Sequence, residues 1–161
     1  PRWNGHFYNW YHTCTLRPMP PLYVSTVDSG NCAAALLTAA NALRGWGRDA
    51  LAARAQILCD GMDFGPLYDP QRRLMHIGID TGSGKWSESY YDLLASEARL
   101  TSYFAVARGD VPREHWRALC PFFGIGEYHF IGAPMQDVRE IDHETLLQDA
   151  LAQAKALAES F

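Results

Sequence analysis

The fold is decided by residues 28–59, which read DSGNCAAALLTAANALRGWGRDALAARAQILC. The opening residues 28–31 offer helix-capping side chains, and the alanine- and leucine-rich run at 32–46 then predicts a helix. The side chains expected on its buried face, at helical spacing, are Ala33, Leu36, Leu37, Ala40 and Leu43. Glycines end this helix, and a second helix is expected over 48–59. The short link between them predicts two antiparallel neighbours.

The segments on either side of this helical pair have other patterns. Residues 1–27 are rich in aromatic residues and proline without a regular period, which predicts an ordered loop with short extended pieces. Residues 74–80 alternate as a strand does, and the turn-forming sequence at 80–84 predicts a small β-hairpin within 61–85. Further helices are expected over residues 87–107, 112–120 and 142–160, with turns or short strands over 121–138. The expected fold class is mainly α.

Composition narrows the classes of function. Hydrophobic residues make up 48% of the 161-residue chain and charged residues 20%, as in an ordinary globular protein. The net charge of −4 and the scattered Lys and Arg residues exclude nucleic acid as the main partner, because phosphate binding needs clustered basic side chains. No apolar run reaches the roughly 20 residues of a membrane span. The start Pro1-Arg2-Trp3-Asn4 is not a signal peptide.

Cysteine usage indicates a reducing compartment. The four cysteines are Cys14, Cys32, Cys59 and Cys120. They form no Cys-x-x-Cys pair and are too few for a disulfide scaffold, so reduced, core-filling thiols and a cytoplasmic location are expected. His12 with Cys14 could ligate a metal only if distant residues completed the set, and neither a metal nor a cofactor is expected. Residues 82–85 lack the spacing of a phosphate loop.

Glu97 fits its predicted surroundings least well. A helical projection of residues 87–107 puts it in the middle of an apolar stripe. That stripe consists of Tyr90, Leu93, Leu94, Leu100, Thr101 and Phe104. A carboxyl group in apolar surroundings has a raised pKa, which suits proton donation to a glycosidic oxygen. The structural alternative is a buried glutamate that pairs with an arginine or caps a neighbouring helix.

The most aromatic stretch is His6-Phe7-Tyr8-Asn9-Trp10-Tyr11-His12. Sugar rings present C–H faces that stack on aromatic side chains, whereas Asn, Asp and His bond the sugar hydroxyls. A sugar-binding site is therefore one interpretation, and an aromatic plug packed under a loop is the other. Asp28 and Asn31 are similarly open, since they lie at a predicted helix start and could either cap that helix or face a cleft.

Three stretches of the chain together resemble one protein family. They are Phe7-Tyr8-Asn9-Trp10-Tyr11, YVSTVDSGN at 23–31 and SYYDLLASEARL at 89–100. The family is the central glucoamylase-like domain of the cyclic β-1,2-glucan synthases, which is related to the β-1,2-glucanases. The shorter strings at 67–70, 74–78 and 109–116 extend the resemblance, which covers about residues 3–119.

The resemblance implies an (α/α)6 toroid, in which helix pairs surround a sugar-binding cleft. It implies action on β-1,2-linked glucan, by transglycosylation and cyclisation or by hydrolysis, with a β-glucan oligosaccharide as the partner. Glu97 is similar to a catalytic carboxylate of the family, the nucleophile of a retaining mechanism. The substrate-binding side chains that the resemblance implies are Phe7, Tyr8, Asn9, Trp10, Tyr11, Asp28, Asn31 and Tyr90.

Residues 120–161 do not continue the resemblance and form a divergent tail with a terminal helix. The family's second carboxylate segment is not found there, although glycoside cleavage needs two carboxyl groups. Glu127 and Asp137 have no spacing that recommends them. The chain is therefore expected to be a single domain and an incomplete toroid, which either dimerises or belongs to a larger, membrane-associated synthase. The alternatives to an enzyme are a non-catalytic glucan-binding module and a structural fragment.

Overall fold

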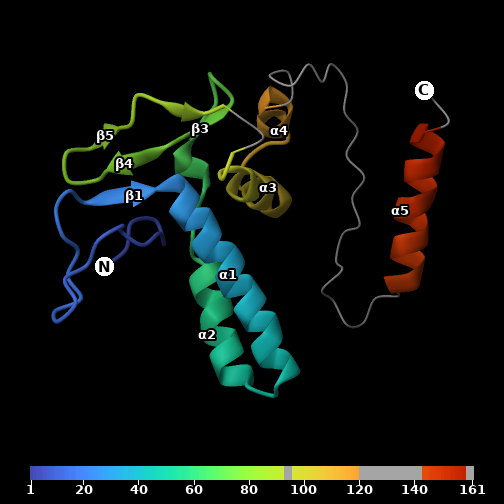
Figure 1. Cartoon of the computed structure of the whole chain (residues 1–161), viewed down its shortest axis with the longest axis horizontal. Helices are drawn as coiled ribbons and strands as arrows, with labels where there is room; N and C mark the ends of the chain where they lie inside the picture. Colours follow the sequence, from blue (N-terminus) through green and yellow to red (C-terminus); the bar gives the residue numbers. More distant parts are fainter. Residues whose placement is uncertain (93–95, 120–142, 159–161) are drawn as a thin grey trace. The chain divides into compact units, whose positions relative to one another are not determined.

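The computed structural model of the chain describes residues 1–92, 96–119 and 143–158 (Figure 1). The chain divides into two compact units, residues 1–124 and residues 125–161. In the first unit, the described residues form mainly helices together with two small antiparallel sheets. In the second unit they form one helix, α5 (His143–Ala158), where the sequence predicts a helix over 142–160. The predicted turns of 121–138, with Glu127 and Asp137, lie outside the described residues, as does Cys120.

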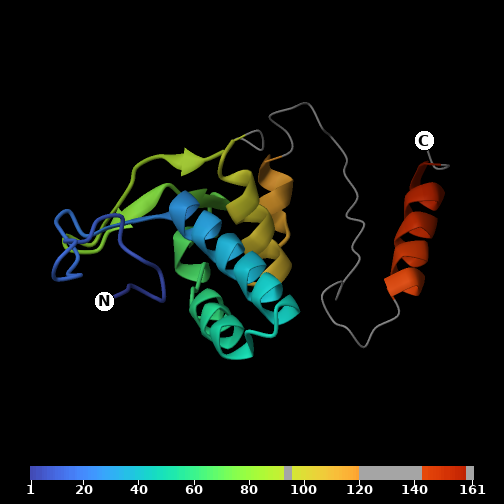
Figure 2. The same cartoon turned by 60° about the horizontal axis from the view of Figure 1, so that its bottom comes forward.

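The predicted helical pair is confirmed as α1 (Thr26–Gly45) and α2 (Asp49–Asp60). The two helices lie side by side in both views (Figure 2). Helix α1 begins earlier than the predicted Cys32, because Ser25 is the N-cap and its Oγ accepts a hydrogen bond from the Asp28 amide at 3.2 Å. The interpretation of Asp28 as the N-cap is therefore wrong. Asp28 lies in the first turn of α1, with its side chain exposed.

The first sheet carries the predicted hairpin. Strands β4 (Gly78–Asp80) and β5 (Lys85–Trp86) pair antiparallel, and β1 (Tyr23–Ser25) adds to the other edge of β4. The turn is closed by Asp80, whose two carboxylate oxygens accept hydrogen bonds from the Gly82 amide at 3.0 Å and the Ser83 hydroxyl at 2.9 Å. These bonds lower the pKa of Asp80, the Ser83 bond most. Because β1 leads directly into α1, this sheet fixes where α1 starts.

The second sheet overturns the prediction of a helix over 87–107. Strand β6 (Tyr90–Tyr91) pairs with β3 (Leu74–His76), which also pairs with β2 (Tyr68–Asp69) after the 3-10 turn η1 (Gly65–Leu67). Among the described residues of this segment, 87–92 and 96–107, the helix found is α3 (Arg99–Arg108), which Gly109 ends in the left-handed conformation with φ of 80°. Tertiary pairing of the two tyrosines with β3 has overridden the helical spacing of this segment.

Because residues 90–91 form a strand and α3 begins only at Arg99, Glu97 does not lie in a helix. It lies in the turn that precedes α3, outside the helix, and its side chain is exposed. Ser96 makes the turn, since its Oγ accepts the Ala98 amide at 3.2 Å and its carbonyl accepts the Arg99 amide at 3.1 Å. The predicted apolar stripe around Glu97 is therefore wrong. Leu93 and Leu94 lie outside the described residues.

The core of the first unit lies where α1, α2 and α3 meet the second sheet. Its largest fully buried apolar side chains are Phe64, Met62, Leu67, Met75 and Leu119, the last from α4 (Glu114–Leu119). The prediction that the cysteines are reduced and fill the core holds for Cys59 but not for Cys14. Cys59 is buried and its thiol donates to the Ala33 carbonyl at 3.4 Å, whereas Cys14 is exposed and fills no core. Both cysteines, and Cys32, are free thiols.

Candidate functional site

A cavity of about 360 Å³ lies at the start of α1; we call it the Asp28 cavity. Its lining comes from residues 7–9, from α1 and from the segment after α2: Phe7, Tyr8, Asn9, Asp28, Ser29, Cys32 and Met62. The cavity thus combines aromatic and apolar walls with an amide and a carboxylate. Apolar walls with a few placed polar groups are typical of small-ligand sites.

Asn9 ties the aromatic segment to α1. Its side-chain oxygen accepts the Ser25 amide at 3.1 Å, and its Nδ2 donates to Asp28 Oδ2 at 2.9 Å. Its own amide donates to the Tyr23 carbonyl at 2.9 Å. Asn9 therefore holds the Asp28 carboxylate in one orientation from a fixed backbone position, as a built polar site requires.

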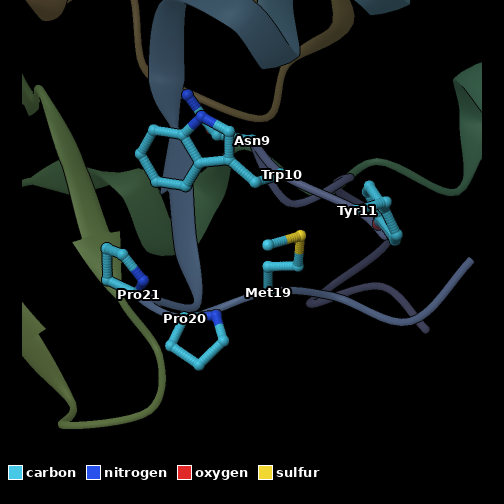
Figure 3. A pocket seen from close by; sticks show the side chains of 6 residues that line it. All are labelled: Asn9, Trp10, Tyr11, Met19, Pro20 and Pro21. Carbon is cyan, nitrogen blue, oxygen red and sulfur yellow. The ribbon is translucent and has the colours of Figure 1, made fainter. Parts of the chain in front are cut away.

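A second cavity, of about 470 Å³, also has Asn9 in its lining; we call it the Trp10 groove. It is lined by Asn9, Trp10, Tyr11, Met19, Pro20 and Pro21 (Figure 3). The close view shows the Trp10 indole standing across the hollow from the two prolines. Asn9 lines both cavities, so the two are neighbours along residues 9–10.

The aromatic stretch is partly a plug and partly an open surface. The tyrosines are half-buried, and Tyr11 accepts the Tyr8 amide at 3.0 Å and donates to the Pro1 carbonyl at 2.9 Å. Trp10 and Phe7 are exposed, at 48% and 38% of their surfaces. The Arg2 guanidinium lies 5.6 Å from the centre of the Phe7 ring, and the Trp10 ring packs against that of Tyr23 at 6.4 Å between centres. Each ring therefore offers a ligand only the part of its surface that stays exposed, while the tyrosines hold the loop together.

Tyr91 was not predicted as a site residue, and its phenol is affected by the charges of both candidate carboxylates. Burial raises the pKa of the Tyr91 phenol, and the charges of Glu97 and Asp28 raise it further, as Tyr23 does. Glu97 and Asp28 therefore act on the same phenol from two separate segments. The sequence signal for this residue was its place in the Tyr90-Tyr91 pair, since adjacent strand residues face opposite sides.

The Tyr90 side chain contacts other residues than that of Tyr91, namely Asp69, Arg72 and His76. Its hydroxyl donates to Asp69 Oδ2 at 2.8 Å, the Arg72 guanidinium lies 4.9 Å from the centre of its ring, and His76 packs on the ring at 4.6 Å. Asn31 lies exposed on α1 and lines neither cavity. The structure therefore brings together Phe7 to Tyr11 and Asp28 at the two cavities, whereas Glu97, Tyr90 and Asn31 line neither of them. Other lining residues that the sequence did not indicate are Met19, Pro20, Pro21, Ser29, Cys32 and Met62.

Neither a metal-binding cluster nor a membrane-spanning helix is found among the described residues. Over the described ranges, no group of three or more His, Cys, Asp or Glu side chains is arranged to hold a metal ion. Among the helices in that same part of the chain, none has the length and apolarity that crossing a bilayer requires.

The chain is similar to one curated protein over part of its length. A segment of 66 residues, or 41% of the chain, is 53% identical to the cyclic β-(1,2)-glucan synthase NdvB of Rhizobium meliloti (strain 1021). The segment spans 2% of that synthase's length. No family model matches the chain.

Proposed function

We propose that this chain is a β-1,2-glucan-processing unit, part of a larger synthase-type protein, that binds a glucan chain at the Asp28 cavity. The observation that carries the proposal is the Asn9–Asp28 pair, held at 2.9 Å within an aromatic cavity. The similarity to a cyclic β-1,2-glucan synthase supplies the substrate class. A role in β-glucan synthesis follows from the two together.

The chemistry of the cavity suits a sugar ring. A carboxylate and an amide accept and donate hydrogen bonds to neighbouring hydroxyls, and the fixed orientation of Asp28 lowers the entropy lost on binding. Phe7 offers an exposed ring at the cavity wall. Ser29 adds a buried hydroxyl with no hydrogen-bond partner within the described residues, which a sugar hydroxyl would satisfy.

For the reaction itself we propose Glu97 as the nucleophilic carboxylate and Asp28 as its partner. Glycoside cleavage needs one carboxyl group to attack the anomeric carbon and a second to protonate the departing glycosidic oxygen. The sugar then leaves the first carboxylate when a hydroxyl of water or of another sugar attacks, with its proton returning to the second. Support for Asp28 comes from its place in the cavity lining, and support for Glu97 comes from the stretch at 89–100 that resembles the family. The rest of an (α/α)6 toroid would come from the remainder of the larger protein or from a second copy.

Turnover of linear β-1,2-glucan by the purified chain tests this assignment. Glu97→Gln and Asp28→Asn each remove a charge with little change of shape, and each should lower the rate about 100-fold or more. Glu88→Gln is the matched control, since Glu88 is exposed on the chain before β6 and pairs only with Lys85 at 3.5 Å among the contacts of the described residues. Full activity in the Glu97→Gln variant would contradict the catalytic assignment.

A non-catalytic glucan-binding unit is the second candidate. The exposed position of Asp28 favours it, because a solvated carboxylate lacks the apolar surroundings that a proton donor to a glycosidic oxygen exploits. In that case the chain binds the glucan without turnover. Asp28→Asn then weakens binding, and Glu97→Gln leaves it unchanged.

A further inference from the structure

We propose that Ser29 is a specificity-determining residue of the Asp28 cavity, which selects its ligand by one sugar hydroxyl that bonds the Ser29 hydroxyl. This inference rests on the proposed function and adds to it a requirement for a single, identifiable hydroxyl of the sugar. Ser29 lines the cavity and is 4% exposed, and its Oγ has no hydrogen-bond partner among the described residues. The resemblance implies roles for its neighbours Asp28 and Asn31 but none for Ser29.

The lack of a partner sets Ser29 apart from the other buried hydroxyls in the described part of the chain. Each of the others makes a hydrogen bond of 2.6–3.5 Å: Ser25, Thr26, Thr101 and Ser102. On α1 itself, Thr38 follows the usual local pattern, in which its Oγ1 donates to the Ala34 carbonyl one turn earlier at 2.9 Å. A buried hydroxyl without such a bond lowers the stability of the folded chain, so its presence at a cavity wall indicates a ligand that bonds it.

The cavity wall next to Ser29 is apolar. Cys32 follows three residues later on α1 and is half-buried, Met62 is fully buried, and both line the cavity. In such surroundings a hydrogen bond to a ligand is stronger than it is in water. The Ser29 hydroxyl can donate and accept, so it suits a sugar hydroxyl, which does the same. A sugar that lacks this hydroxyl would cover Ser29 and leave it unpaired, and sites built in this way reject the analogue.

Calorimetric titration with the β-1,2-linked disaccharide of glucose and its full set of monodeoxy analogues tests this selection. The unaltered chain should bind one of the analogues at least about tenfold more weakly than the parent disaccharide, a difference of about 1.4 kcal/mol. Ser29→Ala should bind the parent about tenfold more weakly than the unaltered chain does, and it should no longer distinguish the parent from that analogue. This pattern ties Ser29 to one hydroxyl of the sugar.

Thermal unfolding of the free chain tests whether Ser29 is unpaired without ligand. Ser29→Ala removes a buried hydroxyl that has no partner, so the variant should have a Tm about 2–4 °C higher. Ser102→Ala is the matched control, because Ser102 is also a serine buried in a helix, but it bonds His115 Nε2 at 2.8 Å. That variant should have a lower Tm and unchanged sugar binding. The two substitutions change helix propensity alike, so their contrast reports the hydrogen-bond partner.

The outcomes separate this inference from the proposed function. If Ser29→Ala binds the disaccharide and its analogues as the unaltered chain does, while Asp28→Asn weakens them all, selection by Ser29 is wrong and the proposed function stands. Equal binding of every deoxy analogue by the unaltered chain would also overturn the inference. So would a fall in Tm for Ser29→Ala, because Ser29 would then have a partner in the free chain. If the folded, unaltered chain binds none of the sugars, both proposals fail.

Discussion

Asn9 is the residue on which the geometry of the site depends. Its side-chain oxygen accepts a hydrogen bond from the Ser25 amide, and its side-chain nitrogen donates one to the Asp28 carboxylate. Removing the side chain leaves a backbone donor without its acceptor and lets the carboxylate turn. We therefore expect Asn9→Ala to weaken glucan binding about tenfold and to lower the free energy of unfolding by about 1 kcal/mol.

Asn31 supplies the control for that experiment. It is the same residue type, is exposed on the same helix and lines neither cavity. Asn31→Ala should leave the affinity, measured by calorimetry, unchanged, and it should not lower the free energy of unfolding in urea, because alanine favours the helix more than asparagine does. If the two variants behave alike, then Asn9 does not position Asp28.

Two buried histidines make the stability of the chain depend on pH. Burial lowers the pKa of His6 and of His115 below the ordinary value of 6.5. His115 Nδ1 faces the Arg73 carbonyl at 2.9 Å, so this nitrogen carries the proton, and the other ring nitrogen accepts the Ser102 hydroxyl at 2.8 Å. The neutral ring is therefore the form that fits the folded state.

The free energy of unfolding should consequently fall as the pH drops below about 6.5. In this range the histidines of the unfolded chain bind protons, whereas the two buried histidines of the folded chain stay neutral. Above that pH the contribution is complete. Each histidine contributes a slope of at most about 1.4 kcal/mol per pH unit. Urea unfolding at pH 7.5 and 5.5 measures it. His115→Gln should reduce the slope, and an unchanged slope would show that His115 is not responsible.

At the scale of helices, replacing each of two glycines of α1 by alanine is expected to change the stability of the chain in opposite directions. A Cβ on Gly30 would collide with the Thr101 side chain of α3, whereas a Cβ on Gly45 would meet nothing within 4 Å. Gly30→Ala should therefore destabilise the chain by about 1–3 kcal/mol through overpacking. Gly45→Ala should stabilise it by up to about 1 kcal/mol, because alanine favours the helix. Thermal unfolding of both variants decides whether α1 and α3 approach each other at Gly30.

The helical pair could be predicted from the sequence because its signals are local. The alanine- and leucine-rich runs, the glycines between them and the hairpin turn at Asp80 each act over a few residues. The start of α1 was missed because Ser25 caps the helix from the end of a strand. That strand exists only through pairing with β4, which lies far along the chain.

The segment around Glu97 could not be predicted in the same way. Its apolar residues have helical spacing, but β3 offers Tyr90 and Tyr91 an antiparallel partner, and such pairing is invisible in one local stretch. The residues from Phe7 to Tyr11 stand out in the sequence because a dense aromatic run with Asn9 is unusual in itself, and in the structure they line the two cavities. Nothing local in the sequence indicates that Met19, Pro20 and Pro21 line the same groove as Trp10.

At the scale of the whole molecule, the described residues of the first unit form a helical body with a cavity of about 360 Å³ at the start of α1 and an apolar groove that shares Asn9 with it. The aromatic contacts of Trp3 with Trp86 and of His6 with Phe64 connect the first residues to the body. The Asp28 cavity is therefore built partly on α1, which supplies Asp28, Ser29 and Cys32, although its other lining residues lie outside the helices and strands. A site of this kind is expected to keep its geometry without ligand.

The central claim is that this site recognises β-1,2-linked glucose, and linkage-selective binding tests it most directly. Calorimetric titration should compare a linear β-1,2-linked pentasaccharide with a β-1,4-linked pentasaccharide of glucose, each against the full chain and against its Asp28→Asn variant. We expect the unaltered chain to bind the β-1,2-linked sugar at least about tenfold more tightly, and the variant to lose that preference. Equal binding of the two sugars, or no binding by a folded chain, would contradict the account.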